Sequence, residues 1–229
     1  MVIAFWILWV AGAYFASQLI VSVALSALPI DISTSNNTLL LMVVEASTYI
    51  LMLLIGLAGT KLVKDKFKLP GVKKLLGCDR PVRFRDIING FGGSAVYYML
   101  LIAVMFPLML VIPDIISQEQ TIGFGRDGNS WWELALICIA LVIVAPVAEE
   151  LLMRGLLFGR IRDKLPFWPT ALIISAIFAV AHWQINVTID TFILSMVICY
   201  MREKTGTVYP GILMHIIKNG LAYVLLFLV

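Results

Sequence analysis

Ionisable side chains stand inside segments of this sequence that are otherwise apolar. A charged group near the centre of a membrane span costs at least about 2.5–3.5 kcal/mol, so such a residue is normally paired or functional. The charged groups in such segments, together with the only two histidines of the chain, are Glu45, Glu149, Glu150, Arg154, Lys218, His182 and His215. We therefore take these side chains as the first candidates for chemistry.

Two neighbouring glutamates and an arginine share one helical turn. Glu150 and Arg154 are four residues apart, which places them on one helix face and within reach of each other. Glu149 points about 100° away from Glu150 and is free to face another group. A purely structural ion-pair cluster is the alternative, and it fits Glu150 and Arg154 better than it fits Glu149.

The two histidines repeat this four-residue spacing in later apolar segments. Phe178 precedes His182 by four residues, so the two side chains share a helix face. His215 precedes Asn219 in the same way. Counted along helices from a turn near Leu165, Glu149 and His182 both lie roughly 24–26 Å from the turn. The same arithmetic puts His215 roughly 10 Å nearer the predicted cytoplasmic end before any helix tilt.

A carboxylate, two imidazoles and a carboxamide from three helices can activate water. A buried carboxylate beside a histidine can hold a water molecule and take its proton. A second histidine and an amide can donate hydrogen bonds to a carbonyl oxygen as it gains charge, at about 2.7–4 kcal/mol per donor. The same residues can instead bind zinc through Glu149, His182 and His215, since two histidines and one glutamate form a catalytic zinc site. No HExxH pair is present.

Three motifs in this order resemble the signature of the CPBP family, the CAAX proteases and bacteriocin-processing enzymes, also called Abi. The motifs lie within residues 145–220 and read Glu149-Glu150-xxx-Arg154, Phe178-xxx-His182 and His215-xxx-Asn219. The family includes type II CAAX prenyl endopeptidases and bacterial members tied to bacteriocin maturation, self-immunity or peptide signalling. The resemblance implies an intramembrane endopeptidase that acts on a membrane-embedded or lipidated peptide.

The resemblance also implies individual roles. Glu149 is expected to be the base that activates water, with His182 helping to position it, while His215 and Asn219 stabilise the oxyanion. Glu150 is expected to act in the catalytic set as well. The resemblance leaves open whether the hydrolysis depends on glutamate alone or on zinc.

Arg154 and Phe178 are expected to shape this site. Two other functions are alternatives to catalysis. One rival is a non-catalytic immunity or scaffold protein of the same family that binds a membrane-protein partner; such relatives typically lose motif residues, and here all are intact. Another rival is an ion-coupled transporter, which predicts broken helices in paired repeats. The sequence has no such symmetry. We expect structural roles for Glu45 and Lys218, with Lys218 reaching the membrane surface or pairing with Glu45.

The elements that carry these residues are long apolar helices. Of the 229 residues, 61% are hydrophobic and 14% charged, whereas a soluble domain carries about 25% charged residues. Because a bilayer span needs roughly 20 apolar residues, we predict an all-α polytopic transmembrane bundle of about seven spans, between six and eight. The expected spans are 2–28, 38–60, 88–112, 131–159, 167–183, 186–201 and 207–229.

Basic residues fix the predicted topology. Nine of the 17 lysines and arginines lie between spans two and three, in residues 61–86, and such clusters stay in the cytoplasm. Two further clusters fall on the same side: Arg160, Arg162, Lys164 and Arg202, Lys204. The opposite loops are expected to hold Asp31, Asp114, Glu119, Asp127, Glu133 and Asp190 against Arg126. We therefore predict a cytoplasmic N-terminus in the cell membrane of a prokaryote, with the first span retained rather than cleaved.

This organisation predicts that the chain has two parts with different roles. Residues 1–130 are expected to form N-terminal transmembrane helices that set substrate choice, and residues 131–229 a CPBP-like catalytic core. The basic segment is expected to touch lipid headgroups as a loop or short surface helix, not nucleic acid. The three cysteines have no disulfide or metal spacing and are expected to be small buried hydrophobes.

Overall fold

The computed structural model describes residues 2–27, 38–67, 69–115 and 130–229, and these ranges contain helices and no strand. The long helices are α1 (Val2–Ser26), α2 (Thr38–Leu62), α5 (Phe84–Val111), α9 (Phe167–Val180), α10 (Ile185–Thr205) and α11 (Tyr209–Phe227). Residues 131–162 form one further continuous helix. The short elements are α3 (Lys64–Phe67), α4 (Val72–Leu75) and η1 (Pro113–Ile115).

The predicted bundle is confirmed. Within the described residues, six helices are long and apolar enough to cross a membrane, and α9, with 14 residues, is a shorter apolar helix. The seven predicted spans correspond to these helices in order. The sixth is longer than predicted, because α10 has 21 residues and ends at Thr205 rather than near residue 201. The acidic loop residues Asp31, Glu119 and Asp127, and Arg126 with them, lie outside the described residues.

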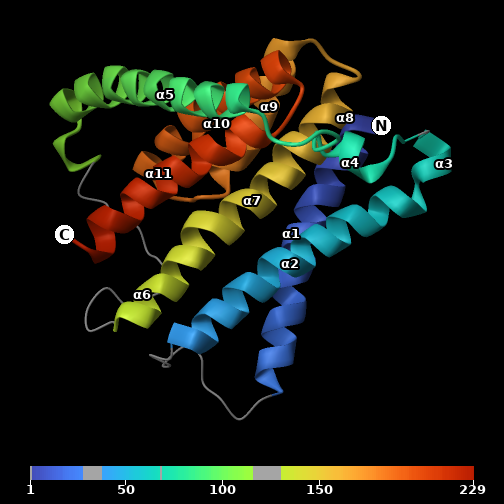
Figure 1. Ribbon diagram of the computed structural model, residues 1–229, viewed down its shortest axis with the longest axis horizontal. Coiled ribbons are helices and arrows are strands. Elements are labelled where there is room, and N and C mark those ends of the chain that lie inside the picture. The colour runs from blue at the N-terminus through green and yellow to red at the C-terminus, as the bar shows by residue number, and fades with distance from the viewer. Residues whose placement is uncertain (1, 28–37, 68, 116–129) are drawn as a thin grey trace.

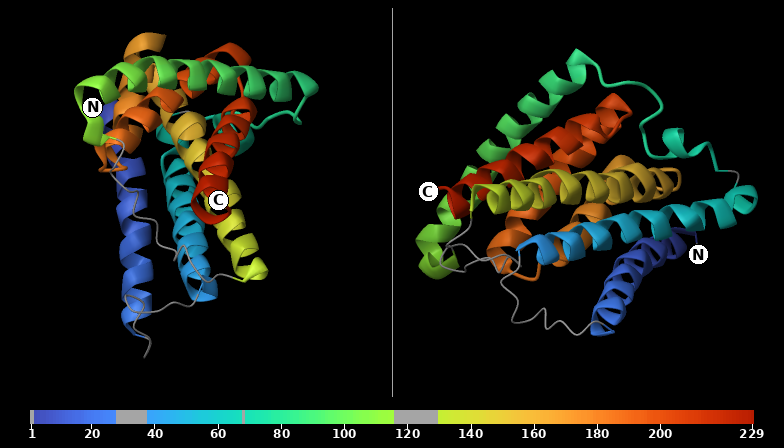
Figure 2. Two further views of the ribbon diagram at one scale, coloured as in Figure 1. Left: turned by 90° about the vertical axis from the view of Figure 1, so that its left-hand side faces the viewer. Right: turned by 60° about the horizontal axis from the view of Figure 1, so that its bottom comes forward.

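The helix of residues 131–162 runs through the middle of the molecule (Figure 1). On one side α1 and α2 pack against it and against each other. On the other side lie α10 and α11, with α5 packed across both of them (Figure 2). Helix α9 pairs with α10. The central helix therefore contacts both the N-terminal pair and the C-terminal helices.

The central helix changes its hydrogen-bond register twice. It consists of α6 (Trp131–Cys138), a π-helical segment η2 (Ile139–Val144), α7 (Ala145–Glu150), a second π-helical segment η3 (Leu151–Leu157) and α8 (Phe158–Arg162). Pro146 explains the first change, because a proline has no N–H and its ring clashes with the preceding turn of an α-helix. Widened π turns inside helices are frequent at functional sites.

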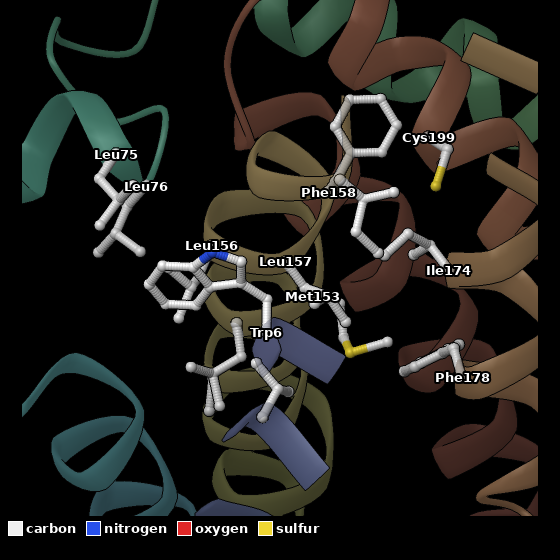
Figure 3. Close-up of a cluster of buried hydrophobic side chains, with 14 of the residues drawn as sticks. Trp6, Leu75, Leu76, Met153, Leu156, Leu157, Phe158, Ile174, Phe178 and Cys199 are labelled. Atoms are coloured by element: carbon white, nitrogen blue, oxygen red, sulfur yellow. The ribbon is translucent and has the colours of Figure 1, made fainter. Parts of the chain in front are cut away.

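The largest apolar cluster joins the two halves of the chain. Figure 3 shows Trp6 of α1 lying beside Leu156 and Leu157 of the central helix, with Phe158 and Ile174 beyond them. All five side chains are at most 3% exposed. Burying a large apolar side chain contributes roughly 1.5–3 kcal/mol, so this cluster holds α1 and α9 against the central helix.

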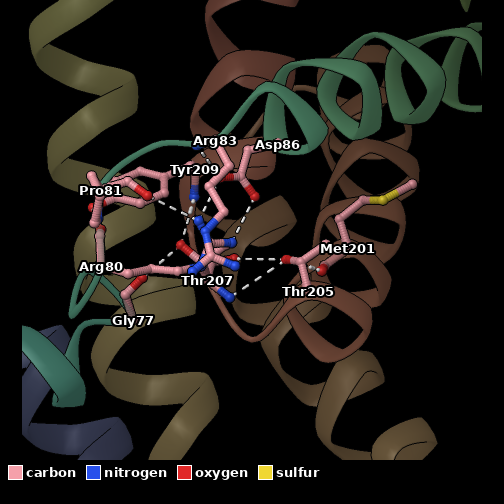
Figure 4. A network of polar contacts seen from close by, with 9 residues as sticks. All are labelled: Gly77, Arg80, Pro81, Arg83, Asp86, Met201, Thr205, Thr207 and Tyr209. Carbon is pink, nitrogen blue, oxygen red and sulfur yellow. Dashed lines mark hydrogen bonds and ion pairs between the residues drawn. The ribbon is translucent and has the colours of Figure 1, made fainter.

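The basic segment between α2 and α5 is packed onto the core at one end of the bundle. Leu75 and Leu76 are buried in the apolar cluster, and α4 lies beside α8 (Figure 1). The carbonyl of Gly77 accepts a hydrogen bond from the Thr207 hydroxyl at 2.7 Å (Figure 4). It also accepts one from the Val208 N–H at 3.3 Å. The predicted short surface helix is present, but the segment also closes the turn between α10 and α11.

A second set of contacts anchors the start of α5 at the same end. Arg80 forms two hydrogen bonds with Asp86, at 2.7 and 2.8 Å, and its carbonyl accepts the Tyr209 hydroxyl at 2.7 Å (Figure 4). Arg162 pairs with Glu203 at 2.9 Å, which links the second and third basic clusters. The three predicted basic clusters thus share one end of the molecule, while the assignment of that end to the cytoplasm stays a prediction.

The cysteines follow the sequence prediction in part. All three lie in the described ranges and are free thiols. Cys199 is fully buried, whereas Cys78 and Cys138 are half-buried. Burial raises the pKa of the Cys78 thiol in the basic segment, which disfavours the reactive thiolate.

Helices α1 and α2 are held together by a close approach at two glycines. The Trp9 indole N–H donates to the carbonyl of Gly56 at 3.1 Å. A Cβ atom at Gly59 would lie 2.0 Å from ring atoms of Trp9, a separation at which one of the helices must move. A glycine at position 59 is therefore required for this packing.

Replacing Gly59 by leucine is expected to separate α1 from α2. The substitution should lower the free energy of unfolding by about 1–3 kcal/mol, the usual cost of overpacking, measured as a lower apparent Tm of the purified protein in detergent. Gly12→Leu in α1 is the matched control, because a Cβ there meets nothing within 4 Å. Equal Tm values for the two variants would contradict this packing.

Candidate active site

A fully buried ion pair forms the centre of the site. Arg154 Nη1 donates to Glu150 Oε1 at 2.8 Å, and both side chains are 0% exposed. His215 Nδ1 lies 3.1 Å from the same oxygen, and because a carboxylate only accepts, Nδ1 carries the proton. The predicted pairing of Glu150 with Arg154 is confirmed, and it is completed by a histidine from α11.

The second oxygen of Glu150 is enclosed rather than bonded. Oε2 is buried and has no hydrogen-bond partner within the described part of the chain. Gly211 of α11 lies next to it, since a Cβ there would be 3.3 Å from Oε2 and 2.5 Å from Ile198. Helix α11 therefore comes close enough to α7 and α10 to enclose the carboxylate.

Phe178 brings the two histidines together. Its ring packs edge-on against His182 at 5.1 Å and against His215 at 5.7 Å between centroids. The Arg154 guanidinium lies over the same ring at 4.7 Å, an attractive cation–π contact. Phe178 is 5% exposed, so this residue shapes the site by fixing three polar groups around one apolar ring.

His182 is oriented by the end of α9. The helix ends at Val180, and Trp183 has a positive φ of 59° that turns the chain away. His182 Nδ1 lies 2.9 Å from the carbonyl oxygen of Phe178. Because a carbonyl only accepts, Nδ1–H is the donor and Nε2 is left available for another group.

Glu149 faces away from the ion pair, as the 100° offset predicts. Its Oε1 accepts a hydrogen bond from the Tyr49 hydroxyl of α2 at 3.0 Å, and its Oε2 lies 3.7 Å from His215 Nε2. The side chain is 21% exposed, against 0% for Glu150. The two neighbouring carboxylates thus have different environments, one enclosed and one open.

Glu149 opens onto a cavity of about 670 Å³ inside the bundle. Glu149, His182 and Tyr49 line it, and the remaining walls are mostly apolar side chains of α1, η3 and α9 such as Phe15, Met153 and Ile177. Volumes of this size are typical of sites for small ligands or peptide segments. Neither Glu150 nor His215 nor Asn219 belongs to the lining.

Asn219 satisfies a backbone group that Pro146 leaves without a donor. The Ala145 N–H bonds to the carbonyl of Ala140 in the π register of η2, so the next N–H in that register should reach Leu141. That position is Pro146, which has no N–H. Asn219 Nδ2 donates to the Leu141 carbonyl at 2.9 Å instead and keeps its second hydrogen.

The three proposed zinc ligands do not converge as a metal site. Within the described residues, no group of three or more histidine, cysteine, aspartate or glutamate side chains is arranged to hold a metal ion. His215 directs Nδ1–H to Glu150 and Nε2 towards Glu149, which pairs it with carboxylates. Because the fit is lacking, we derive no catalytic step through zinc.

Lys218 does not pair with Glu45. Its ammonium lies 3.4 Å from Asp190 Oδ2, and the other oxygen of Asp190 accepts the Tyr97 hydroxyl of α5. The central helix separates α11 from α2 (Figure 1), so the interpretation of Lys218 and Glu45 as partners is wrong. The placement of Asp190 in a loop is also wrong, because α10 places it against the two neighbouring helices.

Tyr49 is a site residue that the sequence did not indicate. It lies in α2, outside the three motifs, and a tyrosine in an apolar span is ordinary. The only available signal was its position one turn after Glu45, since residues four apart share a helix face. The structure places this face of α2 against the cavity.

The fold and the site define a polytopic membrane protein with a glutamate–histidine site that faces a cavity within its helices. Residues 131–221 match the family model described as Type II CAAX prenyl endopeptidase Rce1-like. The matched range contains all three motifs, and the description agrees with the family that the motifs resemble.

One curated relative supports the same family. The chain is 24% identical over 104 residues to a Bacillus subtilis (strain 168) protein with the description "Putative membrane peptidase YdiL". The match covers 42% of this chain and 43% of that relative, less than half of either protein. No solved structure matches this chain.

Removing the charge of Glu150 is expected to destabilise the fold. Glu150→Gln leaves the Arg154 guanidinium buried without a counter-charge, which costs about 3–5 kcal/mol. The measurement is the apparent Tm in detergent. The control is Glu203→Gln, the same change in a half-exposed pair with Arg162, which should cost at most about 1 kcal/mol. Similar losses in both variants would contradict a central role for the buried pair.

Proposed function

We propose that this protein is an intramembrane endopeptidase that hydrolyses a peptide bond in a membrane-embedded or lipidated peptide. The observation that carries the proposal is the placement of Glu149 and His182 on one cavity within the bundle. The family match of residues 131–221 supports peptide hydrolysis as the reaction class. The partial similarity to a protein described as a membrane peptidase agrees with it.

Glu149 is the proposed general base. It is the carboxylate that opens onto the cavity, and the Tyr49 hydroxyl fixes Oε1 so that Oε2 is available to a water molecule. Water bonded to Oε2 loses its proton to Glu149 as its oxygen attacks the scissile carbonyl carbon. Glu149 then returns the proton to the leaving amine nitrogen, so the bond breaks without a covalent intermediate.

The imidazoles and the amide are the proposed donors and positioning groups. His182 holds the water through Nε2, because its Nδ1–H is occupied by the Phe178 carbonyl. His215 stands between two carboxylates, with Nδ1 3.1 Å from Glu150 and Nε2 3.7 Å from Glu149. His215 and the second hydrogen of Asn219 are the proposed donors to the oxyanion.

The lining of the cavity supports a membrane-associated substrate. Its walls are mostly apolar, and Glu149, Tyr49 and His182 are among the few polar side chains that line it. An apolar chain or a hydrophobic peptide segment fits such walls, since it keeps its surface out of water. The peptide bond is then presented to the few groups that do chemistry.

Replacing Glu149 by alanine is expected to abolish cleavage. General-base catalysis contributes about 10²–10⁴-fold, so the rate on a panel of prenylated and unprenylated peptides should fall at least about a hundredfold. The assay uses purified protein in detergent, with folding checked by apparent Tm. Because the candidate ligands do not converge, cleavage by the wild type is expected to continue in a strong zinc chelator.

Two outcomes separate the competing functions. Cleavage that survives in a folded Glu149→Ala variant rules out this mechanism, and a wild type that cuts no peptide of the panel favours the immunity or scaffold function. Loss of wild-type activity in the chelator, restored by zinc, would instead support Glu149, His182 and His215 as metal ligands.

Removing the Tyr49 hydroxyl is expected to slow catalysis without unfolding the protein. A hydrogen bond to a charged group is worth about 1.5–3 kcal/mol, so Tyr49→Phe should lower kcat about tenfold or more, with KM nearly unchanged. The matched control is Tyr98→Phe in α5, whose buried hydroxyl has no partner in the described part of the protein. A Tyr49→Phe variant with wild-type kcat would remove Tyr49 from the site.

A further inference from the structure

A second cavity of about 650 Å³ lies between α1 and α2. Tyr14, Tyr49 and Met52 line both this cavity and the one that holds Glu149. The two helices lie side by side against the central helix (Figures 1 and 2). We call this space the α1–α2 groove, and its shared walls make it a continuation of the site.

The α1–α2 groove carries polar side chains in a pair of apolar helices. Gln18 and Ser22 of α1 face it, together with Glu45 and Thr48 of α2. The Thr48 hydroxyl bonds to the Val44 carbonyl of its own helix at 2.9 Å, so it needs no partner on α1. Thr48 therefore does not draw α1 and α2 together across the groove.

Glu45 is the charged residue in this groove. Within the described residues, Glu45 forms no ion pair, whereas Glu150 has Arg154 at 2.8 Å and Asp190 has Lys218 at 3.4 Å. A carboxylate inside a span is costly and marks a functional site by default, with a partner of opposite charge expected. The described residues supply no such partner to Glu45, so a bound cation would provide one.

The separation of Glu45 from Tyr49 along α2 places the Glu45 carboxylate near Glu149, the proposed base, and so near the peptide bond to be cleaved. Glu45 and Tyr49 are one helical turn apart, about 6 Å along the axis, and the Tyr49 hydroxyl contacts Glu149. An extended peptide covers about 3.3–3.6 Å per residue. A basic side chain within about three residues of the scissile bond can therefore reach Glu45.

We propose that the α1–α2 groove is a substrate-binding site in which Glu45 receives a lysine or arginine side chain of the peptide. The proposal rests on the peptidase function and adds to it a charge preference for the substrate. It replaces the expectation that Glu45 is structural. It also gives helices from outside the matched residues 131–221 a direct part in substrate choice.

The test measures cleavage of farnesylated peptides that differ by one residue. Lysine, norleucine or glutamate is placed in turn at each of three positions on either side of the scissile bond, and kcat/KM is determined for the full-length protein in detergent. At one position or more the wild type should prefer lysine about tenfold. Glu45→Gln should reduce this ratio to about one, and Glu45→Lys should reverse it in favour of glutamate at that position. Glu203→Gln, the same change at a distant surface pair, should keep the wild-type ratio.

A binding assay separates this proposal from the peptidase function. The same fluorescently labelled peptides are titrated against Glu149→Ala with and without Glu45→Gln, so that no cleavage is needed. A lysine preference that disappears with Glu45→Gln supports the groove even when the wild type cuts nothing. Equal affinity of lysine and norleucine peptides at every position, or a preference that survives Glu45→Gln, overturns the proposal.

Discussion

The buried ion pair between Glu150 and Arg154 is the interaction on which the site depends. It joins two turns of the central helix, and its oxygen Oε1 also accepts from His215 of α11. The guanidinium lies over Phe178 of α9. Two charges without water are stable only if their geometry is good and their remaining hydrogen-bonding groups are satisfied or enclosed. The positions of three helices are consequently coupled to one carboxylate.

The backbone of the central helix imposes a second condition on the same region. Inside a bilayer every free carbonyl must find a donor within the protein. Pro146 and the two π-helical segments leave carbonyls that the helix does not satisfy, and side chains from later helices reach them. Asn219 donates to Leu141, and Arg202 Nε donates to the Arg154 carbonyl at 3.1 Å. The wide turns on either side of Glu149 are thus stabilised by α10 and α11.

Much of this could be predicted from the sequence, because it depends on local spacing. The spans follow from apolar length, and the Glu150–Arg154 contact follows from a four-residue interval. The opposite directions of Glu149 and Glu150 follow from the helical repeat. The contact of Asn219 with the Leu141 carbonyl could not be predicted from spacing, since it depends on the register of a π-helical segment in another helix.

Contacts between distant helices account for the other differences. The pairing of Lys218 with Asp190 required knowledge of which helices are neighbours. The packing of Leu75 and Leu76 into the core could not be read from a basic segment whose charges suggested a loop on the membrane surface. In both cases composition predicted the element, and tertiary packing decided its partners.

The site is not confined to the part of the chain that carries the motifs. The family match begins at residue 131, yet Tyr49 of α2 is the hydrogen-bond donor to Glu149 and α1 supplies one wall of the cavity. Helices that bind a substrate need a space beside them, and the polar α1–α2 groove provides it. The catalytic groups can then stay fixed by the Glu150–Arg154 pair while α1 and α2 change in sequence. Under the proposed function, the C-terminal helices set the chemistry and the N-terminal pair sets the choice of substrate.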